Sequence, residues 1–421
     1  MAEFEEPSHI NAEALERILS VTRALARPLD LGEMLQEVVD AARSVLSAER
    51  GTVFLYEKAT HELVSKIATG AQELRLSADL GIVGEAARTR NVINVPDCYA
   101  DSRFNPAVDK LTGYRTRCLM TVPLIGHDDS LEGVLQVLNK HDGVFTEDDE
   151  QVATALAAQC AVALQRTRLL EDLVHKERLE QELSIARQIQ QRVFPREMPV
   201  IENYDVAGWC RTADATGGDI FDLIRLDNGR LVLLLGDATG HGIGPALSVT
   251  QMRAMLRMCV RFGADTTAAV VNINEQLDED LASNRFVTAF LGELDPEKHR
   301  VLYHAGGQGP LLLFRTAGEP DWRSSTTLPL GMMSGLSIKE PSVFDLAPGD
   351  ILVLATDGIF EYENPREDQY GEERLLEIVR AHQELPAADL IGRIVADVEK
   401  FAEGVPQGDD MTIVLVRRLP L

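Results

Sequence analysis

The chain has 421 residues, of which 41 are basic and 67 are acidic, so its formal net charge is −26. This length exceeds a single ordinary hydrophobic core, and we expect two domains joined by a connector. The acidic balance argues against a nucleic acid or an anionic membrane surface as a partner, because both require a basic footprint. The longest apolar runs, 231–235 and 351–355, are strand-sized and far shorter than the roughly 20 residues that cross a bilayer.

The first six residues, Met-Ala-Glu-Phe-Glu-Glu, are acidic and lack the basic and apolar regions of a secretory signal. We therefore expect a cytoplasmic protein. The cysteines have no paired spacing, which indicates neither a disulfide framework nor a zinc site. We expect them to be small buried thiols. They are Cys98, Cys118, Cys160, Cys210 and Cys259.

The first part of the chain has the pattern of an antiparallel sheet flanked by helices. Apolar residues recur at helical spacing over residues 11–46, with Pro28 separating two segments. Strand-like stretches follow, separated by turns or short helical segments such as 81–88. They span residues 52–56, 63–67, 92–95, 119–125 and 134–138.

A long helix is predicted from Glu147 to Phe194, because the interval contains no Gly or Pro and Pro195 ends it. Leucines at 169, 173, 179 and 183 continue an imperfect heptad among many charged residues. This favours a coiled coil in a homodimer, and the alternative is a single helix docked on its own domain.

Beyond Pro199 short apolar strands alternate with helices, notably over 244–262, 266–282 and 372–381. The expected fold class is therefore α/β, in a multi-domain α+β arrangement. We assign a sensor domain to residues 12–166, a linker helix to 167–198 and a mixed α and β domain to 199–421.

Four aspartates in the C-terminal half each stand where a strand is expected to end: Asp219, Asp237, Asp357 and Asp409. Hard divalent cations bind several carboxylate oxygens that converge from separate segments, so the four acids together predict a two-metal hydrolase. A single aspartate at a strand end is ordinarily a turn or helix-cap residue. The prediction therefore depends on the combination.

The motifs around these acids resemble those of the PPM metal-dependent Ser/Thr phosphatases, and specifically the bacterial SpoIIE-like branch. The resemblance covers about residues 200–418 and implies an α-β-β-α sandwich with a dinuclear Mn²⁺ or Mg²⁺ site at one end. The motifs are Gly217-Gly-Asp-Ile-Phe-Asp222, Gly236-Asp-Ala-Thr-Gly-His-Gly242, Ala355-Thr-Asp-Gly358 and Gly408-Asp-Asp-Met-Thr412.

By that resemblance, Asp237 bridges both ions, Asp219 and the main-chain carbonyl of Ala238 hold one, and Asp357 and Asp409 hold the other. No covalent enzyme intermediate is implied.

Four further residues of this region are less certain in role. Asp410 is the expected bystander, although two adjacent acids leave open which of the pair faces the metal site. His241 belongs to the turn that opens the next helix, with a general-acid role as the alternative. Arg211 is a candidate phosphate ligand at an unusual distance from the first metal-site aspartate. Gln308 follows Ala305-Gly306-Gly307 where relatives commonly carry Ala-Gly-His.

The N-terminal half resembles the GAF ligand-binding domains, over about residues 12–166, and most closely the type that binds cyclic nucleotides. The segments that match are 94–106, 109–118 and the ordered series Asn139-Lys140, Phe145, Asp149-Glu150. The resemblance implies that Asp109, Thr112 and Thr116 contact the nucleotide. It also implies that Lys140 and Asp149 form a salt bridge beneath the pocket.

The combined interpretation is a dimeric bacterial phosphatase that acts on a phosphoserine or phosphothreonine protein under the control of cAMP or cGMP. The family suggests a STAS-type anti-sigma-factor antagonist as the substrate. The rival is a catalytically inactive scaffold that senses nucleotide. Another small ligand, or none, is open for the GAF pocket, and degradation of cyclic nucleotide by this domain is disfavoured because it lacks a His and Asp cluster.

Overall fold

The structure is a computed structural model that describes residues 12–25, 27, 30–68, 74–282 and 284–420. The acidic N-terminal residues and Pro28, both used in the predictions above, lie outside the described residues. The chain divides into two compact units, Met1–Arg178 and Leu179–Leu421. Each unit has its own hydrophobic core and is described by itself.

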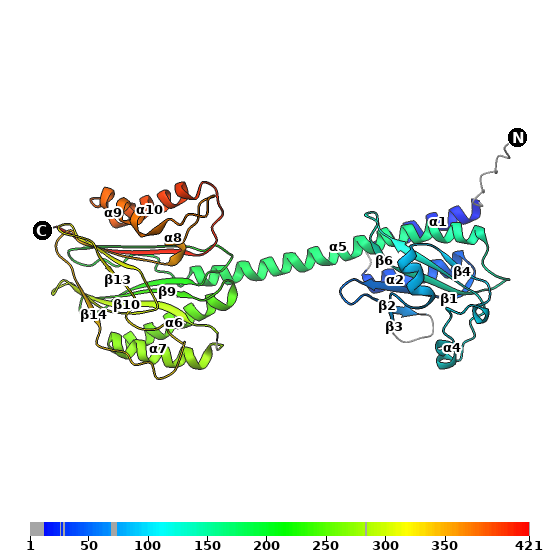
Figure 1. Ribbon diagram of the computed structural model, residues 1–421, viewed down its shortest axis with the longest axis horizontal. Coiled ribbons are helices and arrows are strands. Elements are labelled where there is room, and N and C mark those ends of the chain that lie inside the picture. The colour runs from blue at the N-terminus through cyan, green and yellow to red at the C-terminus, as the bar shows by residue number, and fades with distance from the viewer. Residues whose placement is uncertain (1–11, 26, 28–29, 69–73, 283, 421) are drawn as a thin grey trace. The chain divides into compact units, whose positions relative to one another are not determined.

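The N-terminal unit contains a six-stranded antiparallel sheet, as predicted, with the strand order β3-β2-β1-β6-β5-β4 (Figure 1). The long central pair is formed by β1 and β6, and the middle of each strand is an apolar run that is buried on both faces of the sheet. The strands are β1 (Ala48–Glu57), β2 (Glu62–Ala68), β3 (Leu74–Ser77), β4 (Ile93–Val95), β5 (Leu119–Ile125) and β6 (Leu131–Lys140).

Helices cover both faces of this sheet. The main core lies between one face and the helices α1 (Ala12–Leu25), α2 (Leu31–Val45) and the first turns of α5 (Glu147–Gln191). A smaller core lies under α3 (Gly81–Thr89) on the other face, near α4 (Ala107–Thr112). Asp30 is the N-cap of α2 and forms a complete capping box with Glu33. The Asp30 side chain accepts a hydrogen bond from the Glu33 N–H, and the Glu33 side chain accepts one from the Asp30 N–H.

Helix α5 is a single helix of 45 residues, which confirms the long helix predicted from Glu147. It carries a series of exposed apolar side chains beyond the N-terminal core: Leu169, Leu173, Leu179, Ile185 and Ile189. Among the described helices, none is both long and apolar enough to cross a membrane.

The C-terminal unit is a sandwich of two five-stranded antiparallel sheets (Figure 1). One has the order β14-β11-β10-β9-β8, and the other has the order β13-β12-β15-β16-β7. The first sheet consists of β8 (Asp219–Arg225), β9 (Leu231–Ala238), β10 (Val287–Asp295), β11 (Arg300–Gly306) and β14 (Ser342–Asp345). The second consists of β7 (Tyr204–Arg211), β12 (Leu311–Phe314), β13 (Asp321–Arg323), β15 (Ile351–Ala355) and β16 (Met411–Arg418).

Helix pairs cover the outer faces of this sandwich. Helices α6 (Ile243–Arg261) and α7 (Thr266–Asp280) pack on the first sheet. Helices α9 (Gly371–His382) and α10 (Ala387–Ala402) pack on the second, and the one-turn α8 (Asp357–Phe360) follows β15. The α-β-β-α order confirms the fold that the sequence motifs implied. It places three cores in parallel layers, one between the sheets and one under each helix pair.

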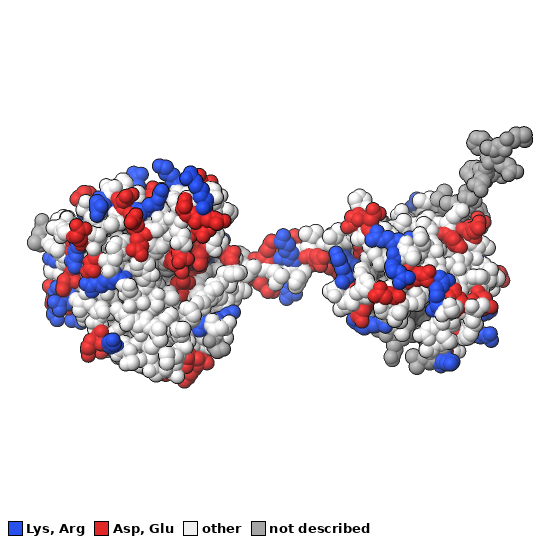
Figure 2. Space-filling model, viewed as in Figure 1, with Lys and Arg blue, Asp and Glu red and all other residues white. Residues whose placement is uncertain are grey.

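The visible surface of this unit carries many acidic side chains, as expected for a chain with 67 acidic and 41 basic residues. On its visible face, Asp and Glu side chains form clusters, whereas Lys and Arg side chains lie scattered (Figure 2). The five cysteines are free thiols; Cys98, Cys118 and Cys160 are buried as expected, whereas Cys210 and Cys259 are only partly buried.

Candidate metal centre and ligand pocket

The two sheets deliver the predicted acids to one end of the sandwich. Asp219, expected at the end of a strand, is instead the first residue of β8, and because β8 and β9 are antiparallel it lies directly opposite Asp237 near the end of β9. Asp357 begins α8 immediately after β15, and Asp409 lies two residues before β16, which is the neighbour of β15. The Thr356 hydroxyl donates a hydrogen bond of 2.7 Å to Asp219 Oδ2. This bond links Asp219 on the first sheet to the segment that carries Asp357 on the second.

Burial and mutual repulsion raise the pKa of these acids. The pKa of Asp219 is raised well above its ordinary value, first because the side chain is buried and then because Asp237 is close. The pKa of Asp237 is raised to about 8, by burial and by the charges of Asp357 and Asp409. Burial and Asp409 also raise the pKa of Asp357. In the described part of the chain, no Lys or Arg is among the groups that shift these pKa values most.

Asp409 and Asp410 differ in their surroundings, which bears on the ambiguity left by the sequence. Asp410 is buried, and its carboxylate accepts hydrogen bonds from the backbone N–H of Ala213 at 2.7 Å and of Asp219 at 3.2 Å. Asp409 is exposed at the rim. Asp410 therefore holds the loop before β8 in place, whereas the Asp409 carboxylate stays accessible.

Glycines make close approach possible around these acids. A Cβ on Gly218 would lie 2.8 Å from the carbonyl oxygen of Ala238 and 3.3 Å from Asp237 Oδ1. A Cβ on Gly358 would lie 1.9 Å from the carbonyl oxygen of Asp410. Only glycine fits both positions, because real Cβ atoms do not approach other atoms so closely.

The other residues singled out in the sequence have separate positions. His241 precedes α6, whose N-cap is Gly242, so the predicted turn is confirmed. Its exposed ring lies 3.2 Å from Asp214 at the edge of a cavity of about 170 Å³ that Asp409 and Asp410 also line. Arg211 forms an ion pair with Glu399, and its Nε–H donates to Gln407 Oε1 at 2.7 Å, so its guanidinium has partners within its own domain.

Gln308 and Asp222 have structural partners. The Gln308 side-chain amide donates to the Ala355 carbonyl at 3.0 Å and accepts from the Thr288 hydroxyl. Thr288 belongs to β10 and lies opposite Asp237 of β9. Asp222 is fully buried in β8 and is paired with Arg253 and Arg257 of α6. Sequence reasoning found neither pairing, because the partners lie far apart in the chain.

The donor chemistry fits hard divalent cations, since every candidate ligand supplies oxygen. Among the described residues, no three His, Cys, Asp or Glu side chains are grouped closely enough to hold an ion as they stand. The space kept by Gly218 beside the Ala238 carbonyl and Asp237 fits an oxygen-ligand site. The roles that we assign to the acids are therefore proposals.

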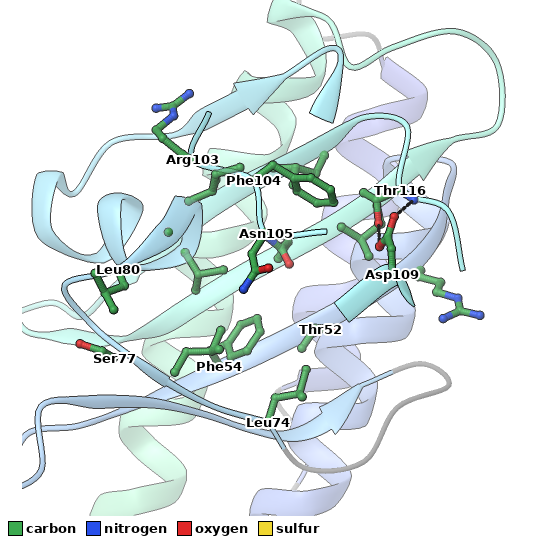
Figure 3. Close-up of a pocket in the computed structure, with 18 of the residues that line it drawn as sticks. Thr52, Phe54, Leu74, Ser77, Leu80, Arg103, Phe104, Asn105, Asp109 and Thr116 are labelled. Carbon is green, nitrogen blue, oxygen red and sulfur yellow. Dashed lines mark hydrogen bonds between the residues drawn. The ribbon is translucent and has the colours of Figure 1, made fainter. Parts of the chain in front are cut away.

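The N-terminal unit contains a cavity of about 430 Å³ between its sheet and the segments around α3 and α4 (Figure 3). Such a volume suits a ligand of mononucleotide size. Most of its wall is apolar, from residues that include Phe54, Leu74, Leu80 and Phe104. Polar side chains also line it: Arg50, Thr52, Arg75, Ser77, Arg103, Asn105, Asp109, Tyr114, Thr116 and Gln136.

Two of the three predicted nucleotide contacts line this cavity. Asp109 accepts hydrogen bonds from both the N–H and the hydroxyl of Thr116, each at 2.7 Å (Figure 3). Asp109 also accepts from the Tyr99 hydroxyl at 3.0 Å. Thr112 belongs to α4 by its backbone, and its side chain lies outside the described residues. The Asp109 carboxylate thus accepts three hydrogen bonds from donors of its own domain.

The Asn-Lys-Phe-Asp-Glu series forms a support beneath this pocket. Lys140 pairs with Asp149 on the first turn of α5, which confirms the predicted salt bridge. Asn139 accepts a hydrogen bond of 2.6 Å from Arg117 N and donates to the Tyr114 hydroxyl at 2.8 Å. The series therefore ties the end of β6 to α5 and to the segment that carries Thr116.

Family comparison agrees with both folds. A family model described as Stage II sporulation protein E (SpoIIE) matches residues 227–419, and a GAF domain model matches residues 30–164. The chain joins a GAF domain to a SpoIIE domain. Asp219 precedes the SpoIIE match, so its assignment depends on its position opposite Asp237.

Individual relatives match parts of the chain. The SiaA-PP2C domain of Pseudomonas aeruginosa is 19% identical with a TM-score of 0.51, and the match covers 58% of this chain and 98% of that one. A probable 3',5'-cyclic phosphodiesterase, pde-5, of Caenorhabditis elegans is 28% identical over 187 residues, which is 41% of this chain. A dual 3',5'-cyclic-AMP and -GMP phosphodiesterase 11 of Drosophila melanogaster is 30% identical over 175 residues, or 37%. The chain spans 25% and 12% of these two phosphodiesterases.

Proposed function

We propose that the chain is a metal-dependent protein serine/threonine phosphatase whose SpoIIE domain hydrolyses a phosphoserine or phosphothreonine protein in the cytoplasm. The observation that carries the proposal is the meeting of Asp219, Asp237, Asp357 and Asp409 at one end of the sandwich. Burial, followed by the charges of Asp357 and Asp409, raises the pKa of Asp237 to about 8, and no basic group is among the leading causes. A site that concentrates negative charge in this way favours cations.

In this proposal Asp237 would contact two ions, Asp219 and the Ala238 carbonyl would hold one, and Asp357 and Asp409 would hold the other. Mn²⁺ or Mg²⁺ bound there would activate water and neutralise charge on the transferred phosphoryl group. The residues of the chain orient the ligands: Thr356 fixes the Asp219 carboxylate by its 2.7 Å hydrogen bond, and Asp410 fixes the backbone before it.

Hydrolysis of p-nitrophenyl phosphate and of a phosphoserine protein by the full chain tests this proposal. We expect activity that requires Mn²⁺ and disappears in Asp237→Asn, whereas Asp227→Asn in the exposed β8–β9 turn keeps it. The rival function is an inactive signalling scaffold. Mn²⁺-independent or absent hydrolysis by the wild-type chain would favour that rival, and full turnover by Asp237→Asn would overturn the metal assignment.

We also propose that the GAF cavity binds a cyclic nucleotide, cAMP or cGMP. Support comes from the cavity volume, the polar group formed by Asp109 and Thr116, and the cyclic-nucleotide phosphodiesterases among the relatives. Calorimetry of the full chain with each nucleotide is the test. Thr116→Val should weaken binding and Thr60→Val, in an exposed turn, should not. Heat silence with both nucleotides would contradict the proposal, and another small ligand is then the alternative.

Finally, we propose that α5 pairs with α5 of a second copy and transmits ligand binding to the SpoIIE domain. The exposed apolar side chains of α5, including Leu169, Leu173 and Leu179, support a coiled coil. Ligand would regulate activity only if it binds one helix arrangement more tightly than the other. Sedimentation of the full chain tests the dimer, and a monomer at all concentrations would contradict it. A STAS-type anti-sigma-factor antagonist is the proposed substrate.

A further inference from the structure

One side chain in the last turn of α5 contacts the loop that leads into Asp219, a proposed metal ligand. Gln190 is 5% exposed, whereas most side chains from Glu171 to Ile189 are exposed. Its Nε2 donates to the Gly217 carbonyl at 2.6 Å, and its Oε1 accepts from the Gly217 N–H at 3.0 Å. The Gln190 side-chain amide thus satisfies both the N–H and the carbonyl of Gly217, and these two bonds fix the position of the Gly217 backbone.

Gly217 is held from the opposite side as well. A Cβ on this residue would lie 2.3 Å from Asp410 Oδ2 and 2.5 Å from Thr212 Cγ2, so its backbone is in close contact with the loop. Asp410 binds the N–H of Ala213 and of Asp219 on either side of it. The segment 213–219 is therefore clamped between Gln190 and Asp410, and its last residue is a proposed metal ligand.

The helix end that carries Gln190 is itself anchored on the SpoIIE domain. Phe194 packs against Phe221 of β8 with ring centroids 5.4 Å apart, and Val193 packs against the core under α6 and α7. The N–H of Val193 donates to the Gln190 carbonyl at 3.0 Å. A rotation of α5 would therefore carry the Gln190 amide away from Gly217 and leave buried polar groups without partners.

We propose that Gln190 is a positioning residue: its amide sets the placement of Gly217 to Asp219 and thereby the affinity of the site for Mn²⁺. The inference deepens, and rests on, the proposed metal-dependent phosphatase. It supplies the contact through which a change in α5 reaches the site, because Gln190 and the first turn of α5 at Asp149 belong to one helix. Gln190 does not touch the reacting groups in this proposal.

The test compares three variants of the full chain. Gln190→Ala removes both hydrogen bonds, Gln190→Met removes them but fills similar volume, and Gln188→Ala is the matched control on the exposed side of the same turn. Mn²⁺ affinity is measured by titration calorimetry, and the Mn²⁺ dependence of p-nitrophenyl phosphate hydrolysis is measured in parallel. We expect both Gln190 variants to bind Mn²⁺ on the order of tenfold more weakly, with turnover recovering at saturating Mn²⁺.

Hydrogen exchange of peptides that cover 213–219 gives a readout that does not depend on activity. The exchange should be faster in both Gln190 variants and unchanged in Gln188→Ala. Wild-type Mn²⁺ affinity or wild-type exchange in the Gln190 variants overturns the inference while the phosphatase proposal stands. If the wild-type chain neither binds Mn²⁺ nor hydrolyses phosphate, the proposed function fails and the inference fails with it, whatever the exchange shows.

Discussion

Replacing Asp237 by Asn should stabilise the metal-free protein although it removes a proposed metal ligand. The Asp237 carboxyl lies opposite Asp219 and near two further acids, and its pKa is raised from 3.8 to about 8. The folded carboxyl is therefore protonated at pH 7, which costs up to about 4 kcal/mol relative to the ionised group of the unfolded chain, since each tenfold displacement of the acid equilibrium is worth about 1.4 kcal/mol. Partial hydration reduces this cost, and we expect a gain of about 2 kcal/mol in Asp237→Asn.

The sign of the pH dependence follows from the same pKa. The folded carboxyl keeps its proton up to about pH 8, whereas the unfolded one loses it near 3.8. The folded state therefore binds more protons between these values, and its stability falls as the pH rises through this window. This slope should be flatter in Asp237→Asn than in the wild-type chain.

Thermal unfolding in the presence of a chelator and in Mn²⁺ is the assay. Without metal, Asp237→Asn should raise the melting temperature of the SpoIIE transition by roughly 4–8 °C, and Asp227→Asn should leave it unchanged. With Mn²⁺ the order should reverse, because only the wild-type chain gains binding free energy. A metal-free Asp237→Asn that melts below the wild type, or one that Mn²⁺ stabilises equally, would refute this reasoning.

Three further outcomes are expected. Gly218→Ala should lower the Mn²⁺ affinity at least tenfold, because its Cβ would lie 2.8 Å from the Ala238 carbonyl, and calorimetry that gives wild-type affinity would contradict this contact. Asp149→Asn should destabilise the GAF transition by about 1–3 kcal/mol in denaturant unfolding, whereas the exposed Asp148→Asn should not, and equal midpoints would contradict a structural role for the ion pair. Burial lowers the pKa of His304, so the unfolded imidazole gains its proton at a higher pH than the folded one. The free energy of unfolding should therefore fall as the pH drops below about 6.5, and His304→Gln should remove this loss in pH-dependent unfolding.

The elements that the sequence predicts well are those with a strong local period. The central strands of the GAF sheet, the long helix from Glu147 and the helices over 244–262 and 266–282 have clear apolar patterns and lie within a few residues of the observed bounds. The short edge strand β3 was not predicted, because four residues carry too little pattern. Helix α10 was not singled out among the C-terminal helices, although its apolar face is buried on the second sheet.

The sequence predicts the acidic residues of the candidate site better than it predicts the residues that hold those acids in place. Asp219, Asp237, Asp357 and Asp409 stand at strand ends, so local sequence marks them. Whether Asp409 or Asp410 faces the loop before β8 depends on packing. The hydrogen bonds that bury Asp410 against this loop join residues far apart in the sequence, so only the structure shows them.

The residues that hold the acids in place come from distant segments. Gln190 contacts Gly217 across 27 positions, Thr356 contacts Asp219 across 137, and Gln308 contacts Ala355 across 47. A threonine or glutamine carries no spacing signal of its own, because its polar group can bond to almost any backbone. Such positioning residues are therefore found from structure rather than from sequence.

The central claim is that acids distant in the chain bind a pair of cations at one end of the SpoIIE sandwich. Anomalous diffraction from crystals soaked in Mn²⁺ tests this claim most directly. The account predicts two peaks, with Asp237 between them, Asp219 beside one, and Asp357 and Asp409 beside the other. Crystals in which these side chains point apart, with no anomalous peak among them, would contradict it.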